Sequence, residues 1–156
     1  MATEHLKLEN QLCFPVYAVS RLITRAYQPF LDELGITYPQ YLALLVLWEK
    51  DNVTVNDIRQ KLVLNTNTVT PLLKRLETMG LIRRSKSTQD ERKVLVELTP
   101  EGRALESRAA TIPERLVGSL STTDLSVDEW MDLKAKLDRV LTSLGSQQNP
   151  TDLGLD

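Results

Sequence analysis

The chain has 156 residues, the length of one domain, and the 42% that are hydrophobic suffice for a core, which excludes a disordered chain. The single cysteine excludes an intrachain disulfide and the single histidine excludes a histidine-rich metal site, so neither a metal nor a cofactor is expected. The net charge of −2 argues against nucleic-acid binding unless the charges are segregated.

The charges are segregated along the chain. From Leu73 to Lys93 seven basic residues stand against three acidic ones, a net charge of +4, which leaves −6 for the remainder. A basic patch on an acidic body confines attraction for phosphate to one face. There is no signal-peptide pattern and no apolar run near the roughly 20 residues that cross a bilayer, so we expect a cytoplasmic protein with no membrane partner.

The first regular element is predicted from Asn10 to about Leu34, where apolar residues recur at helical spacing. Pro29 should kink this helix, and Pro15 is tolerated only near its first turn. Cys13 then lies close to the helix N-terminus, where the positive end of the helix dipole favours the thiolate form of its side chain.

Two shorter helices are expected next. Thr37 and Pro39 start one that is apolar on nearly all sides, which predicts a buried helix. The second starts at a Thr54 or Asn56 cap and ends at the corner before Asn65.

The helix that follows Asn65 is predicted to read DNA. Asn65 caps its start and Gly80 ends it. Thr66, Asn67 and Thr70 are short polar residues on one face, which suit the base edges of a major groove. Two helices joined by a tight corner are typical of a helix-turn-helix motif. The apolar residues of the opposite face form one stripe at three- and four-residue steps: Val69, Leu72, Leu73, Leu76 and Met79.

Two short runs rich in apolar and β-branched residues, 81–85 and 93–99, predict a β-hairpin, the wing. Arg92 near the hairpin tip suits a DNA minor groove, with Asp90 to orient it and Lys93 beside it; the alternative is a solvated wing charge. The basic residues of the DNA-reading helix and the wing are candidates for phosphate contacts, one or two of them being expected in ion pairs within the domain instead: Lys74, Arg75, Arg83, Arg84, Lys86 and Lys93.

After the wing, a helix is expected from Thr99 towards Leu120 with a kink at Pro113. A last amphipathic helix should pass through Trp130 and end near Gly145. The first and last helices carry more apolar surface than a small winged domain can bury alone. We therefore expect a homodimer and, because two-fold proteins read two-fold sites, an inverted-repeat operator in double-stranded DNA.

The predicted fold class is mostly α with a small β-hairpin wing, a winged helix-turn-helix that dimerises through its N- and C-terminal helices. We assign residues 1–36 and 100–145 to a helical dimerisation region and residues 37–99 to the winged helix-turn-helix DNA-binding lobe. Residues 146–156 are expected to form a flexible tail.

Three short motifs in combination resemble the winged helix-turn-helix of MarR-type repressors. They are Leu-Ile-Arg-Arg at 81–84, Asp-Glu-Arg at 90–92 and Leu-Thr-Pro-Glu-Gly at 98–102. The segments at 8–14 and 34–44 are similar to the one-cysteine branch of that family, which senses organic hydroperoxides, and the similarity extends to about residue 145.

This resemblance implies a site as well as a fold. It implies that Cys13 is the peroxide sensor, and that tyrosines hydrogen-bond its sulfur across the dimer. The tyrosines that match the family's motif positions are Tyr17, Tyr27 and Tyr38. Tyr41 is interpreted as an ordinary core residue, and the same alternative applies to the other three. For Cys13 itself the alternative is an inert, buried cysteine.

The chain is thus predicted to be a DNA-binding transcriptional repressor, not an enzyme, that releases its operator when an organic hydroperoxide oxidises Cys13. With no second cysteine, the sulfenic acid must be resolved by a small thiol, a backbone nitrogen, a pair of Cys13 residues between subunits, or over-oxidation. One alternative is a MarR-type repressor gated by a small aromatic ligand. Another is a thiol peroxidase, which the lack of a resolving cysteine disfavours.

Overall fold

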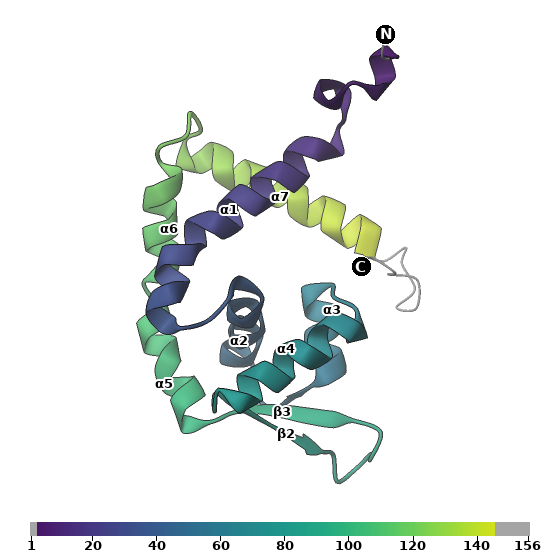
Figure 1. The fold of residues 1–156 in the computed structure, drawn as a ribbon, viewed down its shortest axis with the longest axis vertical. Helices are drawn as coiled ribbons and strands as arrows, with labels where there is room; N and C mark the ends of the chain where they lie inside the picture. The colour runs from purple at the N-terminus through teal and green to yellow at the C-terminus, as the bar shows by residue number, and fades with distance from the viewer. Residues whose placement is uncertain (1–2, 146–156) are drawn as a thin grey trace.

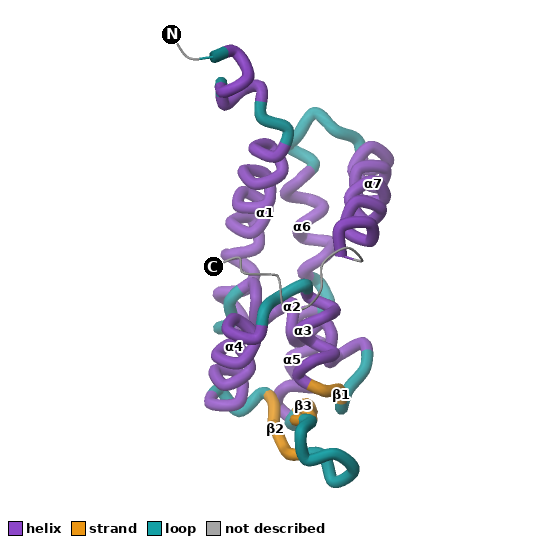
Figure 2. The backbone as a smooth tube through the Cα atoms, turned by 90° about the vertical axis from the view of Figure 1, so that its right-hand side faces the viewer, coloured by secondary structure: helices purple, strands orange, loops and turns teal. Residues whose placement is uncertain are grey.

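The computed structural model describes residues 3–145 (Figure 1). Within this range the chain forms seven α-helices, three short strands and two 3₁₀ turns. The first and last helices lie at one end of the molecule, where Figure 2 shows them standing apart, and the strands with three shorter helices lie at the other end (Figures 1 and 2). None of the helices between residues 3 and 145 is long and apolar enough to cross a membrane. The tail predicted at 146–156 lies outside the described residues.

Helix α1 spans Cys13–Leu34 and ends at Gly35, whose φ of 70° is the left-handed conformation that glycine adopts readily. The predicted start at Asn10 is wrong. The side chains of Asn10 and Gln11 donate hydrogen bonds to backbone carbonyls of the preceding residues, which holds residues 4–10 in two 3₁₀ turns. Cys13 is therefore the first residue of the helix.

Three helices, each started by a side-chain cap, form the opposite end of the molecule: α2 (Tyr38–Glu49), α3 (Val55–Leu62) and α4 (Thr66–Thr78). Thr37 and Gln40 form a capping box for α2, and Thr54 and Asp57 form another for α3, which decides between the two caps expected there. The Asn65 side chain accepts a hydrogen bond from the backbone N–H of the third residue of α4, as predicted.

The wing is larger than the predicted hairpin. Its three antiparallel strands, in the order β1-β3-β2, are β1 (Val53–Thr54), β2 (Ile82–Lys86) and β3 (Val94–Leu98). The first strand was not predicted, because two residues are too few to show the alternation of a strand. It exists because Val53 pairs with Val96 of the hairpin.

The two prolines that were predicted to kink helices have different effects. Helix α1 continues through Pro29 as a single helix. The single kinked helix predicted after the wing is in fact two helices, α5 (Pro100–Ala109) and α6 (Ile112–Leu120). Pro113 has no N–H to donate to the carbonyl of Ala109, and its ring would clash with that carbonyl, so α5 ends there. A loop then leads to α7 (Val127–Gly145).

The core lies between α2, α3, α4, the sheet and the end of α1. Four of the five apolar residues of the predicted α4 stripe are buried, but Met79 is 42% exposed because it stands past the last turn of the helix. Gly80 follows with a φ of 76°, the conformation expected of a residue that ends a helix. The largest fully buried side chains are Leu31, Leu44, Leu47, Ile58, Leu73, Leu76, Ile82 and Ile112.

Candidate nucleic-acid interface and cysteine site

The outer face of α4 presents the polar side chains that were predicted to read bases. Thr66, Asn67 and Thr70 are exposed, and the buried stripe on the other side fixes this orientation. They lie in the first turn and a half of the helix, which is the part of a recognition helix that enters a major groove. Lys74 and Arg75 follow on the same helix and are exposed as well.

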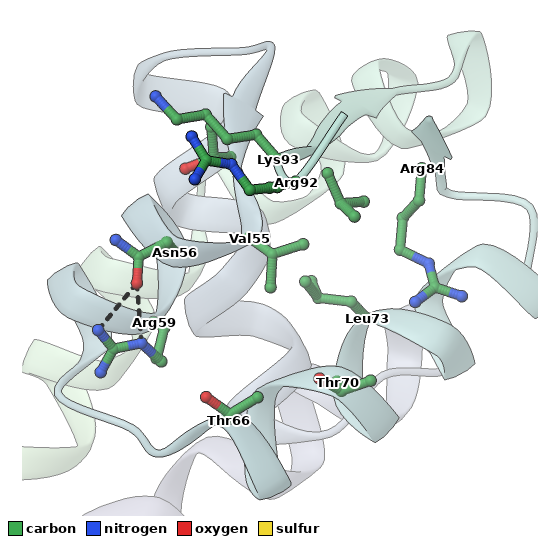
Figure 3. A pocket seen from close by; sticks show the side chains of 11 residues that line it. Val55, Asn56, Arg59, Thr66, Thr70, Leu73, Arg84, Arg92 and Lys93 are labelled. Atoms are coloured by element: carbon green, nitrogen blue, oxygen red, sulfur yellow. Dashed lines mark hydrogen bonds between the residues drawn. The ribbon is translucent and has the colours of Figure 1, made fainter. Parts of the chain in front are cut away.

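A concavity of about 310 Å³ separates α4 from the wing (Figure 3). Thr66 and Thr70 line one side of it, and Arg92 and Lys93 of the wing line the opposite side. Arg84 and a further cation, Arg59 of α3, also reach it. The four cationic side chains around this hollow make it attractive to phosphate or to another anion.

Asn56 and Arg59 were not predicted to belong to this interface. The side-chain oxygen Oδ1 of Asn56 accepts two hydrogen bonds from the Arg59 guanidinium, at 3.1 and 2.8 Å, which directs the cation (Figure 3). The sequence places both residues on the part of α3 that faces away from the buried side of Ile58. A helical period identifies such an outer face but does not tell what that face meets, so the sequence alone does not assign these residues to the interface.

Arg84 is engaged within the domain. Its backbone N–H donates to Glu77 Oε2 at 2.7 Å, and its guanidinium donates to Glu77 Oε1 at 3.1 and 3.3 Å. These hydrogen bonds hold the pKa of the Glu77 carboxyl below its usual value. The pair ties the last turns of α4 to the start of the wing, so Arg84 joins these two elements in addition to lining the concavity.

At the wing tip the Asp90 carboxylate accepts a hydrogen bond from Arg92 Nε at 3.1 Å, as expected of a residue that orients the arginine. This bond, with the bond from the Arg92 backbone N–H, lowers the pKa of Asp90. The Arg92 side chain is 91% exposed, so its charge remains available to a partner. Lys86 and Lys93 are exposed on the same hairpin.

Cys13 is exposed at the start of α1, so within a single chain it is not a buried cysteine. Tyr17 follows one turn later; its ring is also exposed, with the Arg21 guanidinium 5.6 Å from the ring centroid. Tyr27 stands fourteen residues after Cys13, which is about 21 Å along a helix at 1.5 Å per residue. Within one chain these two side chains therefore do not meet.

Tyr27 and Tyr38 pack together instead, with ring centroids 4.9 Å apart. Tyr41 completes the cluster at 5.7 Å from Tyr27 and 6.4 Å from Tyr38, and it is also a buried core residue, as expected. Burial, together with the neighbouring phenols, raises the pKa of Tyr27 to about 12, and burial raises the pKa of Tyr38. Both rings thus remain protonated hydrogen-bond donors at neutral pH.

The elements described above define a class of protein. A capped recognition helix, a preceding helix, an antiparallel wing and a cationic hollow between them form the winged helix-turn-helix of a transcriptional regulator. Residues 25–108 match the family described as transcriptional regulator SarA/Rot, and the chain belongs to this family of MarR-like regulators.

Individual relatives agree with this assignment. The chain is 48% identical over 141 residues to the organic hydroperoxide resistance transcriptional regulator of Bacillus subtilis (strain 168), covering 90% of this chain and 94% of the relative. Reduced AbfR bound to DNA superimposes with a TM-score of 0.73 at 38% identity, covering 90% and 96% of the two chains. AbfR, from Staphylococcus epidermidis, has also been solved in an overoxidized DNA-bound form and a disulfide form. MarR from E. coli gives a TM-score of 0.67 at 27% identity, over 84% and 96%.

Proposed function

We propose that this protein is a transcriptional repressor that binds an inverted-repeat operator as a homodimer and releases it when an organic hydroperoxide oxidises Cys13. The observation that carries the proposal is a single cysteine, exposed at the first position of α1, in a chain 48% identical to an organic hydroperoxide resistance regulator. In this proposal the protein acts in the cytoplasm on double-stranded DNA, as a regulator and not as an enzyme.

The chemistry begins at the Cys13 sulfur. Its thiolate attacks the terminal oxygen of the hydroperoxide, the O–O bond breaks, and the alkoxide leaves as an alcohol after taking up a proton. The product is Cys13 sulfenic acid, so the sulfur is oxidised and the peroxide is reduced. Because the chain has no second cysteine, the sulfenic acid would be resolved by a small thiol, a backbone nitrogen or the partner's Cys13, or would be over-oxidised.

The dimer is proposed to form through residues 1–36 and 100–145, while residues 37–99 read the DNA. Support comes from the apolar side chains left exposed on α1 and α7, among them Val16, Leu22, Met131 and Leu141. In a dimer the Tyr27 and Tyr38 cluster of one subunit would donate hydrogen bonds to the sulfur in the other subunit. Intramolecular geometry favours this arrangement, because the helix holds Tyr27 about 21 Å from its own cysteine.

The DNA contacts are proposed for three groups of residues. The α4 face would meet base edges in the major groove through Thr66, Asn67 and Thr70. Arg92, held by Asp90, would enter the minor groove, with Lys93 beside it. Phosphates would be met by Lys74, Arg75, Arg84 and Lys86.

The test is a fluorescence anisotropy titration on the promoter DNA next to the gene of this protein. Wild type and Cys13→Ser are compared in reduced form and after treatment with cumene hydroperoxide. We expect both reduced proteins to bind alike, because serine differs from cysteine by one atom, and we expect oxidation to weaken only the wild type, by tenfold or more. If both proteins release DNA alike, Cys13 is not the sensor, and gating by a small aromatic ligand becomes the better account.

A further inference from the structure

The wing is anchored at its root by hydrogen bonds that join Thr99 to neighbouring backbone groups. The Thr99 hydroxyl donates to the carbonyl of Gly80 at 2.6 Å and accepts from the backbone N–H of Gly102 at 3.1 Å. The Thr99 backbone N–H donates to the carbonyl of Leu81 at 3.1 Å. Gly80 follows the end of α4, β2 begins at Ile82, and β3 ends at Leu98. This root therefore joins the recognition helix, the wing and the start of α5.

A row of aromatic rings reaches this root from the tyrosine cluster. Tyr27 belongs to α1, Tyr38 and Tyr41 to α2, and the ring of Trp48 in the last turn of α2 lies 6.4 Å from that of Tyr41. The indole N–H of Trp48 then donates to the carbonyl of Gly102 at 3.0 Å. The row thus runs from the C-terminal half of α1 to the first turn of α5.

We propose that Trp48 is a positioning residue that links the tyrosine cluster to the root of the wing, so that a displacement of Tyr27 and Tyr38 reaches the DNA-reading elements. This inference rests on the proposed function, in which those tyrosines hydrogen-bond the partner's Cys13, so that oxidation of that sulfur would disturb them. Trp48 is suited to the task because its ring packs on Tyr41 while its N–H holds Gly102. A phenylalanine would keep the ring contact and lose the hydrogen bond.

A second clamp keeps the root in place when Trp48 changes. The Asp51 carboxylate accepts a hydrogen bond from the backbone N–H of Leu98 at 2.9 Å and forms an ion pair with Arg103. Because these contacts do not involve the indole, the loop after α2 stays fixed to β3 and α5 in a Trp48→Phe variant. Binding of DNA by the reduced variant should therefore be preserved, and its response to oxidation should not.

The experiment measures the dissociation constant for the promoter DNA before and after cumene hydroperoxide, in wild type, Trp48→Phe and Trp130→Phe. Trp130 is the matched control, since its N–H donates to Thr123 Oγ1 at 3.1 Å in the loop before α7, at the other end of the molecule from the wing (Figure 1). We expect Trp48→Phe to bind within threefold of wild type when reduced. Its ratio of oxidised to reduced dissociation constants should be at least fivefold smaller than that of wild type, and Trp130→Phe should keep the ratio within twofold.

The outcomes separate the two proposals. One outcome is that the wild type releases DNA on oxidation and Trp48→Phe shows the same ratio of oxidised to reduced dissociation constants. The proposed role of Trp48 is then wrong, and the proposed function stands. If the wild type itself keeps its DNA, the proposed function is wrong and the role of Trp48 falls with it.

If Trp48→Phe fails to fold, a fluorescence measurement tests whether Trp48 links the tyrosine cluster to the root of the wing. In Trp130→Phe, Trp48 is the only remaining tryptophan, so the fluorescence of this variant reports on the surroundings of Trp48 between Tyr41 and Gly102. We expect oxidation to shift its emission, and we expect the shift to vanish in Cys13→Ser with Trp130→Phe. An unchanged emission on oxidation of Trp130→Phe would overturn the inference.

Discussion

Gly102 occupies the first turn of α5 with its Cα facing the carbonyl of Leu81. A Cβ built on this residue would lie 2.1 Å from the carbonyl oxygen and 3.1 Å from the Leu98 side chain. The obstacle is backbone and cannot rotate away, so any side chain at this position pushes α5 from the root of the wing. Glycine is required here for close approach and not for an unusual φ.

We therefore expect Gly102→Ala to lower the free energy of unfolding by about 1–3 kcal/mol, the usual cost of forcing extra volume into a packed site. The matched control is Gly118→Ala in α6, where the added Cβ has no neighbour within 4 Å apart from the adjacent residues and the backbone of its own helix. That variant should gain about 0.5 kcal/mol, because alanine loses less backbone entropy in a helix than glycine. Urea titrations followed by circular dichroism give both values; equal stabilities of the two variants would contradict the close approach.

Among the elements, α4 and the wing are joined by the Glu77 and Arg84 pair. Hydrogen bonds from Arg84 lower the pKa of Glu77 in the folded state, so the folded protein binds fewer protons there than the unfolded chain. The stability that the ionised carboxylate contributes is fully present above the unfolded pKa of about 4.3 and is lost as the pH falls through the lower folded value.

We expect wild type to be more stable than Glu77→Gln at pH 7, and we expect this difference to shrink steadily below about pH 4.3, where the carboxylate takes up its proton. The difference in free energy of unfolding should be followed by urea titration from pH 7 to pH 3. Since Glu77 is about one-third exposed, solvent screens the pair and the effect at pH 7 is modest. A difference that stays constant with pH would show that the glutamine acts through packing alone.

At the scale of the whole molecule, α1 and α7 leave their apolar faces uncovered in the single chain. A crevice of about 490 Å³ between them is lined mostly by apolar side chains, including Val19, Ile23, Leu133 and Leu137. Exposed apolar surface of this extent marks an interaction site, and closed two-fold symmetry is the commonest way for a chain to cover it with a second copy.

We expect Leu137→Glu to shift the protein from dimer to monomer, because a buried, unpaired carboxylate would stand in the interface. Sedimentation velocity at micromolar concentration measures the shift, and DNA affinity should fall with it, since one half-site replaces two. Arg139→Glu changes charge on the opposite side of α7 and should remain dimeric. A dimeric Leu137→Glu would mean that another surface holds the subunits together.

Much of the fold and of the DNA-reading face followed from local patterns. Asn65 and Gly80 bound α4 through hydrogen bonding and backbone conformation that those residues supply themselves. The buried stripe of α4 follows from its period, and so does the outward position of Thr66, Asn67 and Thr70. Cys13 could be placed at a helix start because Pro15 is tolerated only there.

Other features required the assembled molecule. The two-residue strand at Val53 carries no period of its own and forms because the hairpin pairs with it. The commitment of Arg84 to Glu77 and the reach of Trp48 to Gly102 join residues 7 and 54 positions apart, which no local pattern encodes. The sequence determined which elements form and which faces they present, since hydrogen bonds and sterics within a few residues decide both. Only the tertiary structure decided how the faces meet, because that depends on packing between distant segments.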